Sequence, residues 1–173
     1  MSEKIWGLPV RLDDIPEPGR RFELSPDAAA RSALARLVGV NDVPRLHADL
    51  DVRRVGDGLR VIGRVTGAVG QTCVVSLDPL ENEVEEAIDL LFSPAGALPT
   101  AAADVAELSD ASEPLVDGMI DLGAIATEFF LLGIDPYPRK PGAVFAEQHG
   151  GESSAATSPF AVLAALKKGT DGL

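Results

Sequence analysis

The chain has 173 residues, 46% of them hydrophobic and 5% aromatic, which suits one folded domain with a core of aliphatic side chains. Its single cysteine excludes an intramolecular disulfide, and the sequence shows neither a signal-peptide pattern nor an apolar run of the ~20 residues that span a bilayer. We therefore expect a soluble, cytoplasmic protein that does not contact a membrane.

The net charge of −12 is unevenly distributed along the chain. Fourteen acidic residues lie between Arg64 and Arg139, and no lysine or arginine does. An acidic surface repels nucleic-acid phosphates and attracts basic partners. Glutamates are also common on the solvent-exposed face of a strand without any binding role. A partner-binding acidic surface and a merely solvated one therefore both stay open at this point.

The N-terminal part predicts two extended segments and a helix. Residues 5–12 alternate loosely and should add a strand to the sheet, and residues 20–24 form a short extended piece. Ser25 followed by Pro26 is typical of a helix start, so Ser25 is the predicted N-cap of a helix over residues 27–38. The apolar face of this helix comprises Ala30, Leu34, Leu37 and Val38, and Gly39 is its stop signal.

Residues 44–94 carry the clearest pattern in the chain. Apolar and polar side chains alternate in three runs, the second of which continues through Cys73, Val75 and Leu77. Because only short turns join the runs, they must pair as an antiparallel meander. The second run also contains three glycines that should curve the sheet, namely Gly63, Gly67 and Gly70. The predicted fold class is α+β, with a curved antiparallel sheet, open or barrel-like, covered by two or three helices.

The second half of the chain predicts an insertion, a strand, a helix and an arm. Residues 93–113 are rich in Ala, Pro, Ser and Asp and should form a mobile acidic insertion. Residues 115–120 predict a strand, and 121–132 a helix with Asp121 as N-cap. Its predicted sheet-covering face comprises Leu122, Ile125, Ala126, Phe129 and Leu132. Prolines make 135–142 an extended arm, and we expect a single domain over 1–146, with a linker and C-terminal helix in 147–173.

The sequence contains no recognisable catalytic constellation. The phosphate-binding, dinucleotide and zinc-protease motifs and C-x-x-C are absent, and His47 and His149 have no neighbouring Ser or Cys in sequence. Glu128 has no second carboxylate, histidine or metal ligand spaced to assist it, and Cys73 falls on the apolar parity of its strand. We therefore expect no enzyme activity, cofactor, metal or small-molecule substrate.

Several motifs together resemble the YceD family, the large ribosomal RNA subunit accumulation proteins. They are Gly70-Gln-Thr-Cys73-Val-Val-Ser76-Leu-Asp-Pro79-Leu80, the segments Asp121-Leu-Gly123 and Asp135-Pro-Tyr-Pro138, and the closing Ser158-Pro-Phe160 with its leucines. The resemblance covers about residues 40–170. Many members of the resembled family carry C-x-x-C at Cys73 and a further cysteine in the arm. Here Ser76 replaces the second cysteine and the arm has none, so one thiolate cannot make a four-ligand zinc site.

The resemblance implies a non-enzymatic role in ribosome biogenesis, supporting accumulation of large-subunit ribosomal RNA. The expected partner is that RNA, a basic ribosomal protein in the assembling large subunit, or both; the alternative is an acidic interaction or chaperone module without direct RNA contact. Interleaved aromatics and a nucleic-acid motif are absent around the N-terminal arginines, which weakens the RNA hypothesis. The candidate partner-binding residues are Arg20, Arg21, Arg31, Arg36, Gln71, Glu81, Glu83, Glu85, Glu86 and Arg139.

Overall fold

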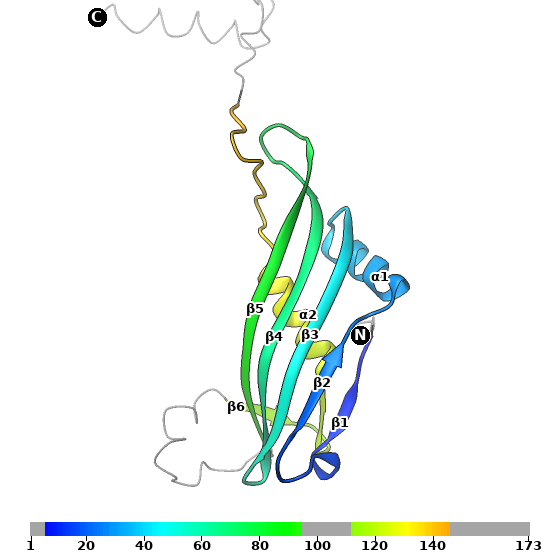
Figure 1. The fold of residues 1–173 in the computed structure, drawn as a ribbon, viewed down its shortest axis with the longest axis vertical. Coiled ribbons are helices and arrows are strands. Elements are labelled where there is room, and N and C mark those ends of the chain that lie inside the picture. Colours follow the sequence, from blue (N-terminus) through cyan, green and yellow to red (C-terminus); the bar gives the residue numbers. More distant parts are fainter. Residues whose placement is uncertain (1–5, 95–111, 146–173) are drawn as a thin grey trace, which may run out of the picture. The chain divides into compact units, whose positions relative to one another are not determined.

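The computed structural model describes residues 6–94 and 112–145, which form an α+β fold (Figure 1). The elements are β1 (Pro9–Arg11), the short 3-10 helix η1 (Leu12–Asp14), β2 (Arg20–Leu24), α1 (Ala28–Val38), β3 (Asp42–Val55), β4 (Gly58–Thr72), β5 (Pro79–Pro94), β6 (Ser112–Leu115), β7 (Met119–Asp121) and α2 (Leu122–Leu132). Five strands form one sheet in the order β2-β3-β4-β5-β6, antiparallel except for the β5–β6 pair. The predicted fold class is confirmed, and the sheet has two ends rather than closing into a barrel.

The chain divides into two compact units, residues 1–143 and 144–173. Nearly all of the second unit lies outside the described residues, and so does most of the predicted insertion, residues 95–111. The predicted domain boundary, the mobility of the insertion and the C-terminal helix therefore stay predictions. None of the helices in residues 6–94 and 112–145 is long and apolar enough to cross a membrane.

Strand alternation places one face of the β3–β4–β5 meander in the core, as predicted. The side chains of this face have no more than 7% of their surface exposed: Leu46, Ala48, Leu50, Val52, Leu59, Val61, Val65, Val69, Val84, Ile88 and Phe92. Their pairing is antiparallel along almost the full length of the strands. The long strands twist and bend along their length (Figure 1), which agrees with the predicted curvature.

The second run of the meander ends earlier than predicted. β4 stops at Thr72, and residues 73–78 form a turn in which Leu77 adopts a left-handed φ of 61° and is 75% exposed. Val75 and Leu77 are therefore not strand residues, although their parity continues that of the strand. Only Cys73, at the start of the turn, keeps the buried position that the alternation predicts.

The first helix is capped by a different residue from the one predicted. Asp27, not Ser25, is the N-cap of α1, because its carboxylate accepts a hydrogen bond from the Ala30 N–H at 2.8 Å. The C-terminal prediction is confirmed, since Gly39 takes a left-handed φ of 73°. The predicted buried face is right in part: Leu34 is buried and Val38 packs against the core, whereas Leu37 is 65% exposed and Ala35, which was not predicted, is buried.

The second helix begins as predicted but buries a different aromatic ring. Asp121 caps α2 by accepting hydrogen bonds from Gly123 and Ala124. Phe130 is completely buried, while Phe129 is only partly buried and Leu132 is 72% exposed. The Phe130 ring packs over Gly67 of β4, where a Cβ atom would lie 2.5 Å from the ring and 2.7 Å from the Arg45 carbonyl oxygen. Gly67 therefore allows the close approach of helix and sheet.

The terminal strands pair differently from the prediction. Residues 5–12 do not join the main sheet; β1 pairs antiparallel with β7 in a separate two-stranded sheet. The single strand predicted over 115–120 is two strands, β6 beside β5 and β7 beside β1. A tight turn separates them, with Asp117 and Gly118 at φ values of 52° and 68°. Two successive left-handed residues are typical of a type I′ hairpin turn.

Candidate interaction surface

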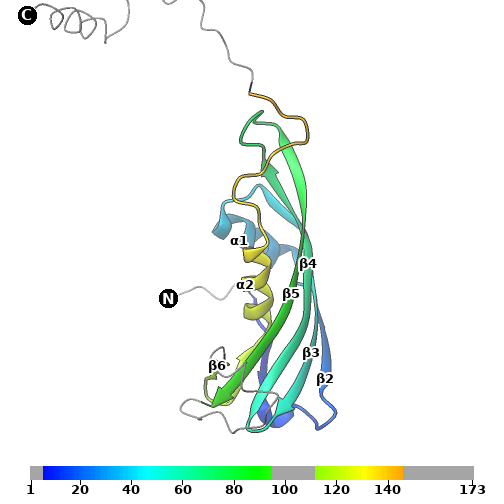
Figure 2. The same cartoon turned by 90° about the vertical axis from the view of Figure 1, so that its left-hand side faces the viewer.

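The helices α1 and α2 cover the same face of the sheet, and no helix of the described residues covers the other face. Figure 2 shows α1 and α2 on one side of the β3–β4–β5 strands. α1 contacts β3, and α2 contacts β4 and β5. The uncovered face, which we call the outer face, carries the polar side chains of the alternating strands. It is a broad surface on which predicted basic and acidic residues meet.

Ion pairs connect one arginine of β3 and two of β4 to the acidic residues of β5 across the outer face. Arg60 binds Asp89 through two hydrogen bonds of 2.9 and 2.8 Å. Arg64 contacts Glu85 at 3.4 Å, and Arg45 forms an ion pair with Glu83. The Arg60 hydrogen bond lowers the pKa of Asp89 below its usual value. The acidic strand is thus partly neutralised by its own neighbours, which the linear distribution of charge along the chain did not indicate.

The Arg45–Glu83 pair also shields a small apolar side chain. Arg45 and Glu83 are the register partners of Ala68 on its two sides. Ala68 has the parity of the outer face, yet it has no exposed surface. We attribute this burial to the ion pair that joins the two neighbours of Ala68, because long charged side chains commonly cover apolar surface with their methylene groups.

The four predicted glutamates of β5 do not share one face. Glu81, Glu83 and Glu85 lie on the outer face and are exposed. Glu86 has the parity of the buried Val84 and Ile88, and its side chain lies against Gly133 after the end of α2. Among the described residues, Glu81 and Glu86 have no ion pair. Adjacent residues of a strand point to opposite faces, so Glu85 and Glu86 cannot act on the same surface.

The predicted arginines of the N-terminal part do not gather into one patch. Arg20 stacks over the Phe22 ring at 4.9 Å, while the next residue, Arg21, points to the outer face and binds Asp49 at 3.2 Å. The Arg21 hydrogen bond lowers the pKa of Asp49. Arg31 donates to the carbonyl oxygens of Val43 and Pro26, so it ties α1 to the chain on either side of it. Arg36, in the last turn of α1, is exposed.

His47 lies between the hydroxyl of Ser25, which is distant in sequence, and the carboxylate of Asp49, which is two residues further along β3. Its Nδ1 is 2.9 Å from the Ser25 hydroxyl, and its Nε2 is 3.3 Å from Asp49. The order serine–histidine–carboxylate is that of a catalytic triad. However, the imidazole is 44% exposed and Asp49 is shared with Arg21, so water and the arginine both compete for these groups. We interpret the three side chains as a polar surface network. Strand alternation alone places His47 and Asp49 on one face of β3, whereas the pairing of β2 with β3 brings Ser25 beside them.

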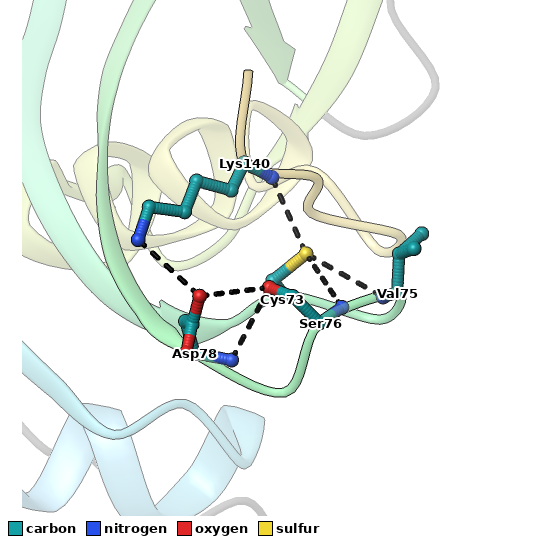
Figure 3. Close-up of polar contacts among 5 residues, drawn as sticks. All are labelled: Cys73, Val75, Ser76, Asp78 and Lys140. Carbon is teal, nitrogen blue, oxygen red and sulfur yellow. Dashed lines mark hydrogen bonds and ion pairs between the residues drawn. The ribbon is translucent and has the colours of Figure 1, made fainter. Parts of the chain in front are cut away.

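Cys73 is the acceptor of a hydrogen-bond network that joins the turn after β4 to the arm (Figure 3). Its sulfur accepts from the backbone N–H groups of Lys140, Val75 and Ser76 at 3.3, 3.4 and 3.4 Å. The Lys140 N–H and then the Ser76 hydroxyl are the largest causes that lower the pKa of the thiol to about 6. The Lys140 ammonium also contacts Asp78 at 3.3 Å, which lowers the pKa of that carboxyl.

The two remaining predicted residues are Gln71 of β4, which makes structural contacts to the arm, and Arg139 of the arm, which is an exposed charge. Gln71 is buried; its amide donates to the Asp135 carbonyl oxygen and accepts from the Asn82 amide, both at 2.8 Å. Together with the bond from Val74 N–H to Pro138, this holds the arm on the end of β4. Gln71 is therefore fully used inside the fold, whereas Arg139 is exposed. Within the described part of the chain, no group of three or more His, Cys, Asp or Glu residues is placed to hold a metal ion.

Comparison with known proteins identifies the family. Residues 61–167 match the family model described as large ribosomal RNA subunit accumulation protein YceD. No curated protein and no solved structure matches the chain. The matched region holds all of β4 except its first three residues, the acidic β5, α2 and the arm, and it spans more than half of the 173 residues. The chain therefore belongs to the YceD family, whose description supports a role in ribosome biogenesis.

Proposed function

We propose that this protein is a non-enzymatic ribosome biogenesis factor that binds a basic ribosomal protein in the assembling large subunit. Through that contact it supports the accumulation of large-subunit ribosomal RNA, which it reaches as part of the particle. The observation that carries the choice of partner is the arrangement of charge on the outer face, where β5 contributes acids and three arginines, Arg45 of β3 with Arg60 and Arg64 of β4, are already bound to them.

A protein that binds RNA gains most of its affinity by placing free Lys and Arg side chains against phosphates. Here Arg45, Arg60 and Arg64 would have to exchange a carboxylate for a phosphate, and each exchange would leave an acid facing the RNA. A basic protein segment meets no such conflict, because the net charge of −12 attracts it. The charges therefore favour a basic protein as the direct partner.

Direct rRNA contact is the second candidate, and the arginines without an ion pair in the described part of the chain favour it. They are Arg11, Arg20, Arg31, Arg36, Arg53 and Arg139. They come from separate elements, and Arg31 is held by backbone carbonyls. In this alternative, replacing Arg20 and Arg36 by glutamine should reduce both the affinity for rRNA fragments and its dependence on salt.

A pull-down experiment distinguishes the two candidates. Tagged protein is recovered from lysate at low and at high salt, with and without RNase. A basic protein partner should remain bound after RNase treatment and be released as salt rises, because exposed charges are screened over about 10 Å at 0.1 M. Loss of every ribosomal protein on RNase treatment, together with the rRNA, would contradict the proposal and favour direct RNA binding.

The non-enzymatic part of the proposal has its own test. The Ser25–His47–Asp49 network and Glu128 are the groups to question. We expect that activated esters are hydrolysed no faster by the wild type than by His47→Ala or Glu128→Gln. Turnover that His47→Ala or Glu128→Gln abolishes would show that the protein is an enzyme.

A further inference from the structure

β5 presents a long strand edge that no other described strand occupies. It pairs with β4 over residues 79–92, whereas β6 pairs only with residues 91–94 (Figure 1). Over residues 79–90 the other side of β5 therefore faces no strand of the described part of the chain. At about 3.3 Å per residue, this edge is about 40 Å long. Its outward backbone N–H and C=O groups form a template on which another strand can pair.

The charge of this edge restricts what can pair with it. Residues 79–90 contain five acidic residues and no basic one: Glu81, Glu83, Glu85, Glu86 and Asp89. Charged side chains commonly protect a strand edge from indiscriminate pairing. When all of them have the same sign, they also select a partner strand of the opposite sign, because opposite charges in cross-strand pairs stabilise a sheet and like charges destabilise it.

The acidic side chains of β5 exclude two occupants of the edge. A second copy of the chain, paired β5 to β5, would bring glutamates opposite glutamates. A nucleic acid offers no strand to pair and would be repelled by the same carboxylates. An extended basic protein segment satisfies both the backbone groups and the charges.

The carboxylates remain accessible although some are already in ion pairs. The side chains of Glu83 and Glu85 are 69% and 67% exposed. A carboxylate has two oxygens and about four acceptor sites, so it can bind a second cation while Arg45 or Arg64 holds the first. Glu81 is exposed and has no ion pair in the described part of the chain.

We propose that residues 79–90 of β5 bind an extended basic segment of a partner protein by strand addition. The segment pairs with the free backbone groups of β5 and places a Lys or Arg at every second position, beside Glu81, Glu83 and Glu85 on the outer face. The inference rests on the proposed function for the basic nature of the partner and adds where and how it binds. Backbone pairing supplies affinity, and the alternating cations supply specificity.

The test uses the full chain and a synthetic peptide of about twelve residues that alternates Lys and Thr, a length that matches the free edge. A second peptide has the same sequence with every other backbone nitrogen methylated on the side that would face β5. The two peptides carry the same charge, so only strand pairing distinguishes them. We expect about tenfold or greater loss of affinity on methylation of the correct set of nitrogens. Alternate amides in residues 79–90 should exchange hydrogen more slowly in the complex with the unmodified peptide.

Matched variants separate the position of a charge from its amount. Glu81→Gln with Glu85→Gln should weaken binding of the unmodified peptide, while Glu17→Gln with Glu23→Gln, an equal change in net charge away from β5, should not. Equal affinity for both peptides, or no protection of residues 79–90, would overturn strand addition. If basic ribosomal proteins nevertheless stay bound after RNase treatment and are released by salt, the proposed function stands without strand addition. If none binds, the proposed function fails irrespective of the peptide result.

Discussion

The contact between the Phe130 ring and Gly67 leads to the largest expected loss of unfolding free energy for a single substitution. Phe130 has no exposed surface, so truncation to alanine removes the whole ring from the core and leaves a cavity. Substitutions of this kind cost about 3–5 kcal/mol of unfolding free energy. Phe129→Ala should cost clearly less, because that ring is only partly buried. Urea denaturation monitored by circular dichroism gives the unfolding free energies of both variants under the same conditions.

The same contact predicts a coupling between two sites. Gly67→Ala alone should destabilise by about 1–3 kcal/mol, since its Cβ atom would lie 2.5 Å from the Phe130 ring. In a Phe130→Ala background the methyl group gains space, so Gly67→Ala should cost less there, although the contact with the Arg45 carbonyl oxygen remains. Phe129→Ala costing as much as Phe130→Ala, or strictly additive effects of the Gly67 and Phe130 changes, would refute this packing.

Two further predictions concern hydrogen-bonded groups. The pKa of the Cys73 thiol is lowered to about 6 in the folded protein, against about 8.5 for a free thiol. The thiolate therefore contributes fully to the stability of the folded state above about pH 8.5, and this contribution is lost as the pH falls through about 6. The stability of the wild type relative to Cys73→Ala should therefore increase as the pH rises from about 6 to 8.5. A difference in stability that stays constant over this pH range would contradict the lowered pKa. Elemental analysis of the wild type should find no stoichiometric zinc. Asp121→Ala should cost about 1–2 kcal/mol, because that carboxylate accepts from the N–H groups of Leu8, Gly123 and Ala124; Asp121→Asn, which keeps an acceptor oxygen, should recover much of the loss in the same urea assay.

The sequence predicted most reliably what depends on local periodicity. Strict alternation over β3, β4 and β5 identified the buried face and the antiparallel pairing. Asp121 and Gly39 were recognised as helix boundaries because capping depends on one side chain or one backbone conformation. Choices between neighbours failed more often. Phe129 and Phe130 are 100° apart on α2, and both fit a broad apolar stripe until the sheet beneath selects one of them.

Non-local contacts account for most of the remaining differences. Residues 5–12 contain a strand, but only β7, more than 100 residues later, decides that it pairs outside the main sheet. The Cys73 sulfur receives its third donor from Lys140, 67 residues away, so parity predicted its burial and not its hydrogen bonds. The ion pairs that neutralise Glu83 and Glu85 likewise depend on strand register, which a count of charges along the chain cannot supply.

The association rate of a four-glutamate variant is the measurement that decides whether the partner is a basic protein. The variant replaces Glu81, Glu83, Glu85 and Glu86 by glutamine, and its control replaces four acids outside β5, namely Asp14, Glu17, Glu23 and Asp51, by the corresponding amides. Both are assayed by association kinetics with purified basic ribosomal proteins and with rRNA fragments. We expect the β5 variant to associate with the protein about tenfold more slowly than the wild type at low salt, and the control variant to be slowed much less. Tighter binding of rRNA by the β5 variant, with no change toward any ribosomal protein, would contradict it.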